Sequence, residues 1–568
     1  MAWVRPAPAP AARALRRGPA CTTDTTYGYH LCDPAASLTG SCTAPTEDSR
    51  LKRVVIAGGG VAGMAAALRL AERGIPVTLI EQDEYLGGKL GAQYSRRTAR
   101  FHEHAYHMFV NWYHNFWQIA GELGVIDAFE PRTSLHYLRK GEFPRTRALS
   151  NVGAPDSLLR NLAAGVLSPA DMWIYSYSLL DLITHPLHRG AFLDTISVNG
   201  FMASRPYMSR EAAIHHHRTL AKAFSSASYN TSARTYQAFI RNGFKQPSPM
   251  MWVMRGGVHD VLIAPWEQRL RALGVEIRTL TRIERLLLDE QGRVAALRCV
   301  RYDRSPSEAQ EGVARALGEE RLEIEGDLIL TLPPQAVVTL LDEPLLERDP
   351  GLARIGELRS EPMVSLDLAF RRSIAGLPRE HVVLLDSEHQ LTFIDNAQLW
   401  PDLPHTCLNV VASETYGFDR LSEGRVLAIL LDELRQYLPF EIDDLDLQRS
   451  YLQPNVGDRL MVHEVGSWRY RPDTRCGIPN LLLAGDYCRN PIDVVTVEGA
   501  IVSGLMAAEV ARAHADIGQP IRYWLPERWP TAPLTALKWL LMPWAYGAKA
   551  LSFCSDELNA WLEPIRPA

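Results

Sequence analysis

Short apolar runs and a helical pattern alternate where the regular sequence begins. The run from Arg53 to Ala57 predicts a buried strand, and Met64 to Arg73 has the spacing of a helix with small residues on its packed side. Gly74 ends this helix, and Ile75 to Glu81 supplies a second apolar run. Parallel strands need a crossover connection between them, so the pattern predicts a βαβ unit.

Farther along the chain the pattern changes twice. Residues 150 to 245 look helical and aromatic, and a helix predicted at 261–273 is followed by strands. Residues 360 to 470 alternate as an antiparallel sheet does. We therefore predict an α/β fold: a Rossmann-type dinucleotide-binding domain interleaved with a substrate domain of mixed or antiparallel sheet plus helices. Its predicted parts are a flexible extension (1–50), three dinucleotide-binding parts (51–150, 257–335 and 471–515), a helical substrate region (151–256), a substrate sheet (336–470) and an apolar C-terminal extension (516–568).

Composition narrows the classes of function. The 60 Lys and Arg residues nearly balance the 65 Asp and Glu residues, so no general field attracts nucleic acid. Eight cysteines without a CxxC pair favour a reducing compartment, and we expect a cytoplasmic protein. The first 20 residues lack the apolar run of a signal peptide; an organellar transit peptide and a disordered tail both stay open.

A glycine-rich turn follows the first predicted strand. Glycine stands at the first, third and sixth positions of the segment Gly58 to Gly63, where it permits a tight turn, close approach to a pyrophosphate and close helix packing. Glu81 ends the second strand, where a carboxylate can bind a ribose hydroxyl and disfavours a 2′-phosphate. The cofactor is therefore predicted to be FAD or NAD; a turn that merely links strand to helix is the alternative.

The next segment distinguishes between the two cofactors. Gly87-Gly88-Lys89, followed by His104 to Phe109, resembles the flavin amine oxidase and phytoene desaturase superfamily, including carotenoid desaturases and hydroxysqualene dehydroxylase-like enzymes. The resemblance covers about residues 51 to 512 and implies FAD as the cofactor. It also implies that the glycines at 87 and 88 lie along the flavin.

A second matching segment lies far downstream. Asn480 to Tyr487 predicts a strand running into a turn, Val497 opens a helix, and the pair is similar to the closing motif of that superfamily. The resemblance implies that Asp486 meets the ribityl-phosphate region and that the helix N-terminus faces the pyrimidine carbonyl of the flavin, where it would stabilise negative charge. An ordinary strand and helix is the alternative. The predicted FAD-binding residues are Gly58, Gly60, Val61, Ala62, Gly63, Glu81, Gln82, Gly87, Gly88, Lys89, Gly485, Asp486, Val495, Val497 and Ala500.

Candidates for catalysis are fewer. His102, His104 and His107 suggest a metal site, but no accompanying carboxylate or cysteine motif has ligand spacing, so we predict no metal. His107 near the flavin is the favoured interpretation, and Tyr487 is the second catalytic candidate. The three histidines at 215–217 cannot share one helical face, which favours solvated or packing roles.

The sequence also limits the reaction. No second GxGxxG unit follows the first, so dioxygen, a quinone or no external acceptor would complete the cycle. No lysine occurs between Lys245 and Lys538, which disfavours the lysine-dependent amine oxidases of the superfamily.

We expect hydride transfer to flavin N5 from a long apolar substrate such as a polyene, isoprenoid or fatty acyl chain, by desaturation or by a redox-neutral isomerisation or dehydroxylation. The segments 112–117 and 173–182 would line its channel. Amine oxidation and a non-catalytic flavin carrier are the alternatives.

The C-terminal stretch 534–553 is apolar and aromatic and lies between lysines. Such a segment suits peripheral contact with a membrane, whereas Pro543 and the lysines disfavour a spanning helix. We favour docking of this stretch on the protein's own core, with membrane contact as the alternative.

Overall fold

The computed structural model describes most of the chain from residue 51 onward. The described ranges are 51–150, 157–186, 190–224, 227–243, 249–306, 313–361, 363–453, 460–525 and 530–562. The predicted flexible extension at 1–50 lies outside the described residues.

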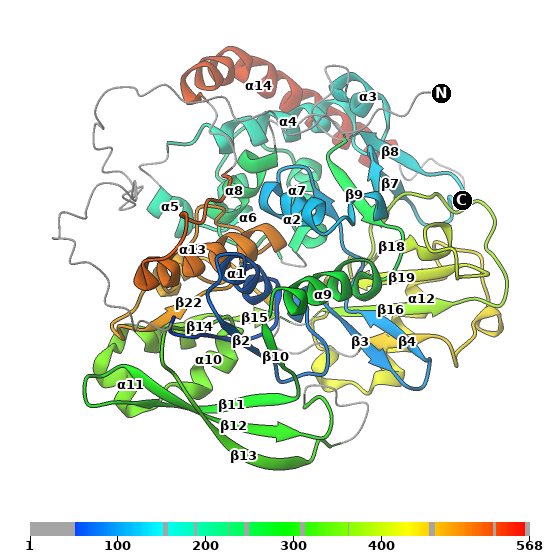
Figure 1. The fold of residues 1–568 in the computed structure, drawn as a ribbon. Coiled ribbons are helices and arrows are strands. Elements are labelled where there is room, and N and C mark those ends of the chain that lie inside the picture. The colour runs from blue at the N-terminus through cyan, green and yellow to red at the C-terminus, as the bar shows by residue number, and fades with distance from the viewer. Residues whose placement is uncertain are drawn as a thin grey trace.

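A five-stranded parallel sheet forms the dinucleotide-binding part (Figure 1). Its order is β10-β2-β1-β14-β22, with every neighbouring pair parallel. The strands are β1 (Val54–Ala57), β2 (Val77–Ile80), β10 (Glu276–Arg278), β14 (Leu328–Leu330) and β22 (Leu481–Leu483). The early strand β1 and the late strand β22 thus both pair with β14 from the middle of the chain, as the interleaved arrangement requires.

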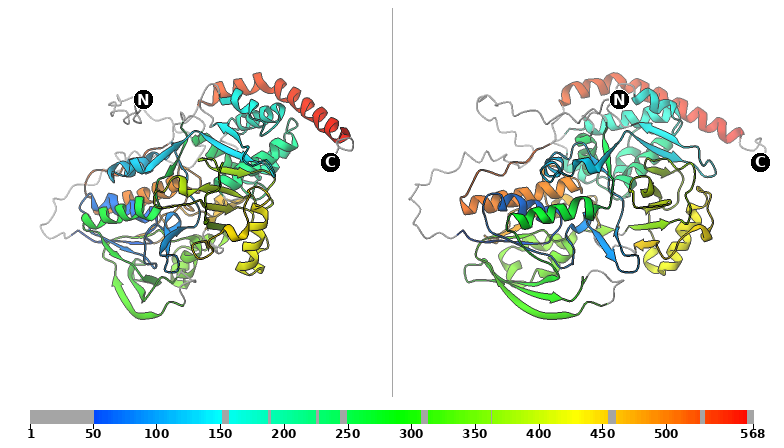
Figure 2. Two further views of the ribbon diagram at one scale, coloured as in Figure 1. Left: turned by 90° about the vertical axis from the view of Figure 1, so that its right-hand side faces the viewer. Right: turned by 45° about the vertical axis from the view of Figure 1, so that its right-hand side comes forward.

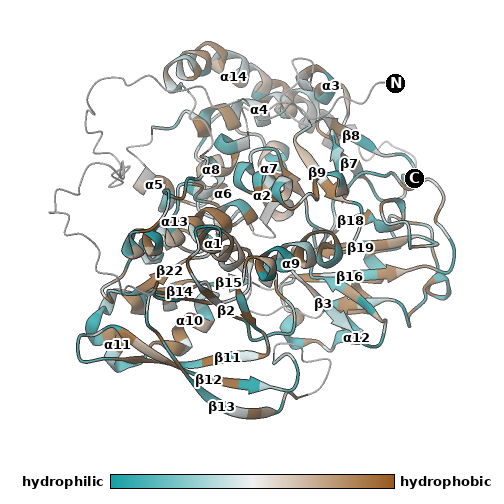
Figure 3. Cartoon of the chain, viewed as in Figure 1, coloured by the Kyte–Doolittle hydropathy of each residue, from teal (hydrophilic) through white to brown (hydrophobic). Residues whose placement is uncertain are grey.

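Each face of this sheet has its own apolar cluster. Val54 and Ile56 of β1 pack with the helices α1 (Val61–Ala71), α9 (Ala264–Ala272) and α13 (Val497–Ala515). Val55 and Ala57 point the other way, as the alternation of a strand demands. They pack toward a second layer that contains β11 (Thr281–Leu288), β12 (Val294–Tyr302), β13 (Ala316–Glu323), α10 (Pro334–Leu340) and α11 (Glu343–Arg348). In Figure 3 the central strands and α1 are brown, whereas β11 to β13 mix brown with teal.

A seven-stranded sheet forms the substrate domain. Its order is β20-β16-β19-β18-β17-β7-β8, antiparallel except for the parallel pair of β17 and β7. Helix α12 (Glu423–Leu434) packs on one face through a cluster of Leu, Val and Phe side chains. The strands are β7 (Ser134–Leu138), β8 (Arg147–Ser150), β16 (Val364–Ala369), β17 (Val382–Leu384), β18 (Thr392–Asp395), β19 (Cys407–Ala412) and β20 (Tyr451–Gln453).

The region between residues 157 and 243 is helical, as predicted. It contains α3 (Ser157–Ala163), α4 (Pro169–Ile183), α5 (Gly190–Asp194), α6 (Val198–Ala203), α7 (Arg210–Phe224) and α8 (Ala233–Gly243). The long helix α14 (Thr531–Leu562) packs on α4 and runs along the outer edge of the molecule (Figure 2). No helix in the described part of the chain is both long and apolar enough to cross a membrane.

Shorter elements join these layers. They are β3 (Ala92–Ser95) with β4 (Arg100–Glu103); β5 (Phe109–Val110), β9 (Met251–Met254) and β6 (Phe129–Arg132); β15 (Ser360–Glu361) with β21 (Leu460–Met461); and α2 (His114–Glu122). A π-helical turn at His259–Ile263 precedes α9, so the helix predicted at 261–273 begins irregularly.

The predicted fold class is confirmed: an α/β dinucleotide-binding domain is interleaved with a second domain of mostly antiparallel sheet and helices. The limits of the parts stay predictions. One observation bears on the limit at residue 150, because β7 and β8 precede it and yet extend the seven-stranded sheet.

Candidate functional site

The turn between β1 and α1 is shaped by glycine. Gly58 has a φ of 109°, and a Cβ on Gly63 would lie 2.1 Å from the carbonyl oxygen of Gly58. The Thr331 hydroxyl donates to that same oxygen over 2.7 Å and holds the turn against β14. Helix α1 begins at Val61, and no side chain caps its N-terminus at Gly60. The first turn therefore presents backbone N–H groups, which suit a phosphate.

The second glycine pair packs directly on this turn. The Gly87 N–H donates to the carbonyl oxygen of Gly59 over 2.8 Å. Gly88 has a φ of 57°, and a Cβ there would lie 2.9 Å from the Cα of Gly60. Only residues without a side chain allow the two backbones to meet this closely. The two predicted glycine segments therefore form one wall of the candidate cofactor site.

Glu81 lies at the carboxyl end of β2, as predicted. One carboxylate oxygen accepts from the Gly59 N–H over 2.7 Å, and the other accepts from the Asp83 N–H over 3.1 Å. Burial, together with the charge of Asp83, raises the pKa of Glu81 to about 7. A ribose hydroxyl donating to this carboxylate would favour its ionised form. Gln82 follows, half-buried, at the same edge of the sheet.

Lys89 and Asp486 meet across the site, although 397 positions separate them. The Lys89 Nζ lies 2.8 and 3.1 Å from the two carboxylate oxygens of Asp486. The preceding Gly485 has a φ of 142°, and its N–H donates to the buried Ser503 hydroxyl of α13 over 3.0 Å. The structure therefore brings the early and the closing motif together, as the resemblance implied.

Helix α13 starts at the predicted position. Thr496 caps its N-terminus by accepting from the Gly499 N–H over 3.1 Å. Farther along the helix, a Cβ on Gly504 would lie 2.1 Å from the carbonyl oxygen of Ala62, so α13 crosses α1 at backbone contact. The predicted residues Val495, Val497 and Ala500 are half-buried around this N-terminus.

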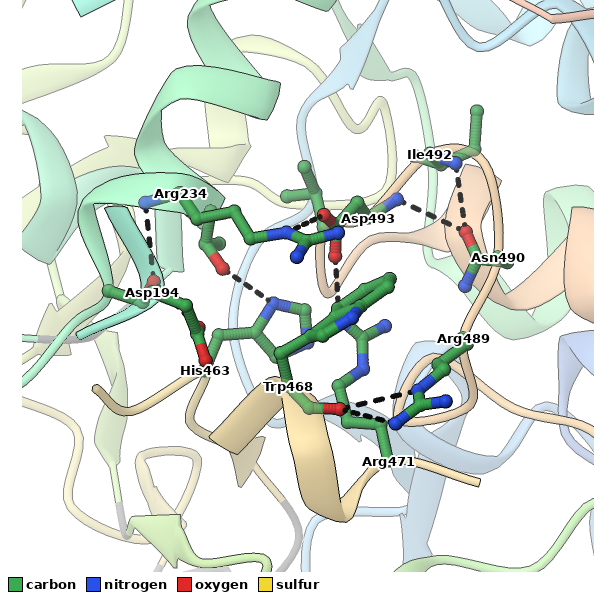
Figure 4. A network of polar contacts seen from close by, with 12 residues as sticks. Asp194, Arg234, His463, Trp468, Arg471, Arg489, Asn490, Ile492 and Asp493 are labelled. Carbon is green, nitrogen blue, oxygen red and sulfur yellow. Dashed lines mark hydrogen bonds and ion pairs between the residues drawn. The ribbon is translucent and has the colours of Figure 1, made fainter. Parts of the chain in front are cut away.

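A buried arginine organises the loop between β22 and α13 (Figure 4). The Arg471 guanidinium donates to the carbonyl oxygens of Tyr487 and Cys488 over 2.9 and 2.8 Å and to the Asp493 carboxylate over 2.7 Å. Its side chain is 1% exposed. Asp493 has a φ of 55°, a conformation that non-glycine residues seldom adopt. The network therefore fixes both ends of the closing loop.

The same aspartate binds a second arginine from the helical region. Arg234 of α8 donates to Asp493 over 2.9 Å, and its guanidinium lies 3.5 Å from the ring centroid of Trp468. The guanidinium groups of Arg471 and Arg489 lie 4.9 and 5.6 Å from the same ring. The members of this network lie far apart along the chain and share no motif, so the sequence does not predict it.

His463 is buried next to this network (Figure 4). Its Nδ1 lies 3.0 Å from the Thr235 hydroxyl of α8. Burial, with the nearby charges of Arg471 and Lys89, holds the pKa of His463 well below its usual value. A neutral imidazole beside Lys89 is thus part of the site that the sequence did not reveal.

The two catalytic candidates have different surroundings. His107 Nδ1 lies 3.1 Å from a carboxylate oxygen of Glu103, whose other oxygen accepts from the Val258 N–H over 2.8 Å. Tyr487 is 1% exposed in the apolar cluster behind the parallel sheet, with the buried thiol of Cys488 as a neighbour of its hydroxyl. Burial raises the pKa of Tyr487 well above its usual value. The catalytic roles of both residues stay predictions.

The segment around His107 lies against the polar face of the seven-stranded sheet. The Tyr106 N–H donates to the Asn409 side chain over 3.0 Å, and Asn409 donates to Asp367 over 2.6 Å. The Tyr106 hydroxyl contacts Thr392 over 2.6 Å and also contacts His381. The substrate domain therefore positions the segment that carries His107.

The predicted channel segments lie in two clusters. Trp112 is 1% exposed in the cluster around α1 and α2, whereas Trp173 is half-buried in the helical cluster of α4. Phe239 of α8 packs against both clusters. The channel stays a prediction, with α8 as the element that adjoins both walls.

The histidines have separate partners. His102 lies 2.7 Å from Asp367 and 2.6 Å from Thr98, which ties the β3–β4 hairpin to the sheet. His216 contacts Ser178 and Tyr236, and burial lowers its pKa to about 3, which suits a packing role. Among the residues that the structure describes, no group of three or more His, Cys, Asp or Glu side chains could hold a metal ion.

Comparison with known proteins gives consistent results. Residues 61–512 match the family model for flavin containing amine oxidoreductases. The chain is 23% identical to a 15-cis-phytoene desaturase of Synechococcus elongatus, covering 82% of this chain and 96% of that protein. It is also 23% identical to the chloroplastic/chromoplastic 15-cis-phytoene desaturase of Arabidopsis thaliana, covering 84% of this chain and 82% of that protein.

A solved structure supports the fold. Putrescine oxidase with putrescine bound superimposes with a TM-score of 0.59 at 16% identity, covering 81% of this chain and 99% of that one. At this identity the likeness concerns the fold alone.

Proposed function

Because the chain belongs to the family of flavin containing amine oxidoreductases, it is an FAD-dependent oxidoreductase, and we propose that it desaturates a long apolar substrate. The observation that carries this proposal is the near full-length similarity to phytoene desaturases. The substrate class would be a polyene, an isoprenoid or a fatty acyl chain. A redox-neutral isomerisation or dehydroxylation of such a substrate is the related possibility.

The described residues fit FAD. Gly60 and Gly88 leave a space for the cofactor that a single added Cβ would fill. The N-terminus of α1 next to this space offers backbone N–H groups to the pyrophosphate. Glu81 would hold the ribose, while Lys89 and Asp486 would hold the ribityl-phosphate region. When bound, FAD supplies a two-electron acceptor that takes up a hydride.

The protein's own part in desaturation would be to orient the substrate and to remove one proton. Desaturation takes a hydride from one carbon and a proton from its neighbour, and the electrons then pass to dioxygen or a quinone. Glu103 lies on the Nδ1 side of His107, so an Nδ1–H donated to it leaves Nε2 as the basic nitrogen. We assign proton removal to His107. The phenol of Tyr487 is buried in an apolar cluster, which suits packing better than proton transfer.

Two further observations support carbon chemistry over amine oxidation. The chain has no lysine between residues 245 and 538, so no lysine of that region can serve the flavin. The helical region beside the site is lined by a large apolar cluster, which suits a substrate without charge.

The test is the absorbance spectrum of the purified protein under anaerobic conditions. An isoprenoid, a fatty acid and an amine are added in turn, and bleaching of the flavin identifies the class that is oxidised. We expect the isoprenoid or the fatty acid to bleach it. Bleaching by the amine alone would support amine oxidation, and no bleaching would favour a redox-neutral or carrier role. Replacing His107→Gln should slow bleaching about a hundredfold or more while FAD stays bound.

A further inference from the structure

The inner face of α14 is fixed to the protein. The Ser552 hydroxyl donates to Asp171 of α4 over 2.7 Å in a buried contact, and Lys538 pairs with Asp181 of α4 over 3.2 Å. Ala545 is fully buried in the helical cluster. The predicted docking on the core is therefore present along one side of the helix, and it determines which side faces outward.

The outer side carries large apolar residues in two rows. Leu537, Trp544 and Leu551 are separated by seven positions, as are Trp539, Tyr546 and Phe553. Seven residues make nearly two helical turns, so each row runs along one line of the helix. All six side chains are exposed, and Trp544 and Leu551 reach 69% and 68%.

Between the two rows runs a strip of exposed, mostly small residues. From Thr531 to Ser555 the sequence contains no Asp or Glu and only two charged residues, Lys538 and Lys549. Lys549 is half-buried and lies one turn from Tyr546 and Phe553, at the edge of their row on the side of the buried face. The strip consists of Ala536, Leu540, Pro543, Gly547, Ala550 and Cys554, and its Leu540 is 69% exposed.

We propose that this outer surface of α14, made of the two rows and the strip, lies on a lipid bilayer with anionic headgroups. The surface offers apolar area and almost no hydrogen-bonding groups, while its tryptophans and tyrosine suit the boundary between acyl chains and headgroups. Lys549 provides the charge complementary to anionic lipid. No described helix is able to cross a membrane, so the contact is peripheral.

The position of α14 favours a flat surface as its partner. The helix lies along the outer edge of the molecule in every view and continues past α4 (Figures 1 and 2). It also lies outside the segment that matches the family model. Binding at this surface does not depend on the proposed reaction, although it would bring the helical region close to a store of apolar substrate.

The experiment is co-sedimentation of the FAD-loaded full-length protein with vesicles of phosphatidylcholine and phosphatidylglycerol. The triple variant Trp539→Gln, Trp544→Gln, Leu551→Gln should lower the bound fraction about tenfold or more, because three large side chains no longer favour the bilayer. The single variant Lys549→Glu should weaken binding only when phosphatidylglycerol is present. Both variants should keep the flavin spectrum, which shows that they are folded.

A matched control replaces three exposed apolar residues elsewhere: Leu317→Gln, Tyr416→Gln and Leu447→Gln, which are 51%, 96% and 52% exposed. This control should bind vesicles like the unmodified protein. The proposal is overturned if the unmodified protein does not sediment with vesicles, or if the α14 triple variant binds as well as the control. It is also overturned if light scattering shows a dimer that only the α14 variant disrupts and vesicles do not compete for, since a second copy would then cover this surface.

Discussion

The two ends of the cofactor site are built in different ways. At the glycine-rich turn the fit depends on missing side chains, since a Cβ on Gly63 would lie 2.1 Å from the backbone of Gly58. At the closing loop the fit depends on charged side chains, since Arg471 and Asp493 hold the backbone of residues 487 and 488 in place. The first end is determined by neighbours in sequence, and the second by residues that meet only in the fold.

The largest expected effect therefore lies at the charged end. Replacing Arg471→Met leaves the Asp493 carboxylate and the carbonyls of Tyr487 and Cys488 without their shared donor. We expect the free energy of unfolding to fall by about 3–5 kcal/mol, the usual cost of breaking one side of a buried pair. Urea denaturation measures this, and the ratio of flavin to protein absorbance should fall with it.

Arg469→Met provides the control two positions away. Arg469 is exposed and stacks on Tyr470, so its loss should change stability by no more than about 0.5 kcal/mol. Equal losses in the two variants would show that the closing loop does not depend on the buried network.

This contrast also explains what the sequence could predict. The turn at Gly58, the pair at Gly87 and the start of α13 at Val497 were predicted correctly because each is a local backbone requirement. Arg471, Asp493 and His463 were missed because a buried ion pair between distant residues leaves no periodic or spaced signal. The same limit applies to β7, because its partner β17 lies more than 200 residues later in the chain, and to β8, which joins the sheet only through β7.

Glu498, in the first turn of α13, is a buried carboxylate held by N–H groups. It therefore adds a titratable group to the charged end of the site. It accepts from the backbone and side-chain N–H groups of Asn115 and from the Phe116 N–H, over 2.9, 2.6 and 3.0 Å. Burial raises its pKa from 4.5 to about 7. The folded state thus holds this proton more tightly than the unfolded chain does.

Stability should therefore decline as pH rises. The contribution of Glu498 is complete below pH 4.5 and is lost as pH rises through about 7, a change of up to about 3 kcal/mol. Glu81 acts in the same direction. Urea denaturation at pH 5 and pH 8 should show a smaller pH difference for Glu498→Gln than for the unmodified protein. An unchanged difference would show that Glu498 is already ionised at pH 5.

Where α13 crosses α1 near the glycine-rich turn, the expected loss of stability is smaller and has a steric cause. Gly504→Ala places a methyl group 2.1 Å from the carbonyl oxygen of Ala62, so α13 must move away from α1. We expect a loss of about 1–3 kcal/mol, the usual cost of overpacking, and weaker retention of FAD. Gly424→Ala in α12 is the control: a Cβ there meets nothing within 4 Å, and alanine should stabilise that helix slightly. Similar Tm values for the two variants would contradict the backbone contact.

The smallest effect tests whether the helical region supports the charged end. Arg234→Met removes one of the two arginines on Asp493 and the stacking on Trp468, while Arg471 remains to pair the carboxylate. We therefore expect a loss of about 1 kcal/mol, typical of a partly buried cation–π contact. Urea denaturation measures it against Arg425→Met on the exposed side of α12. If Arg234→Met instead costs as much as Arg471→Met, then α8 and the closing loop form one unit, and the charged end of the site extends into the substrate region.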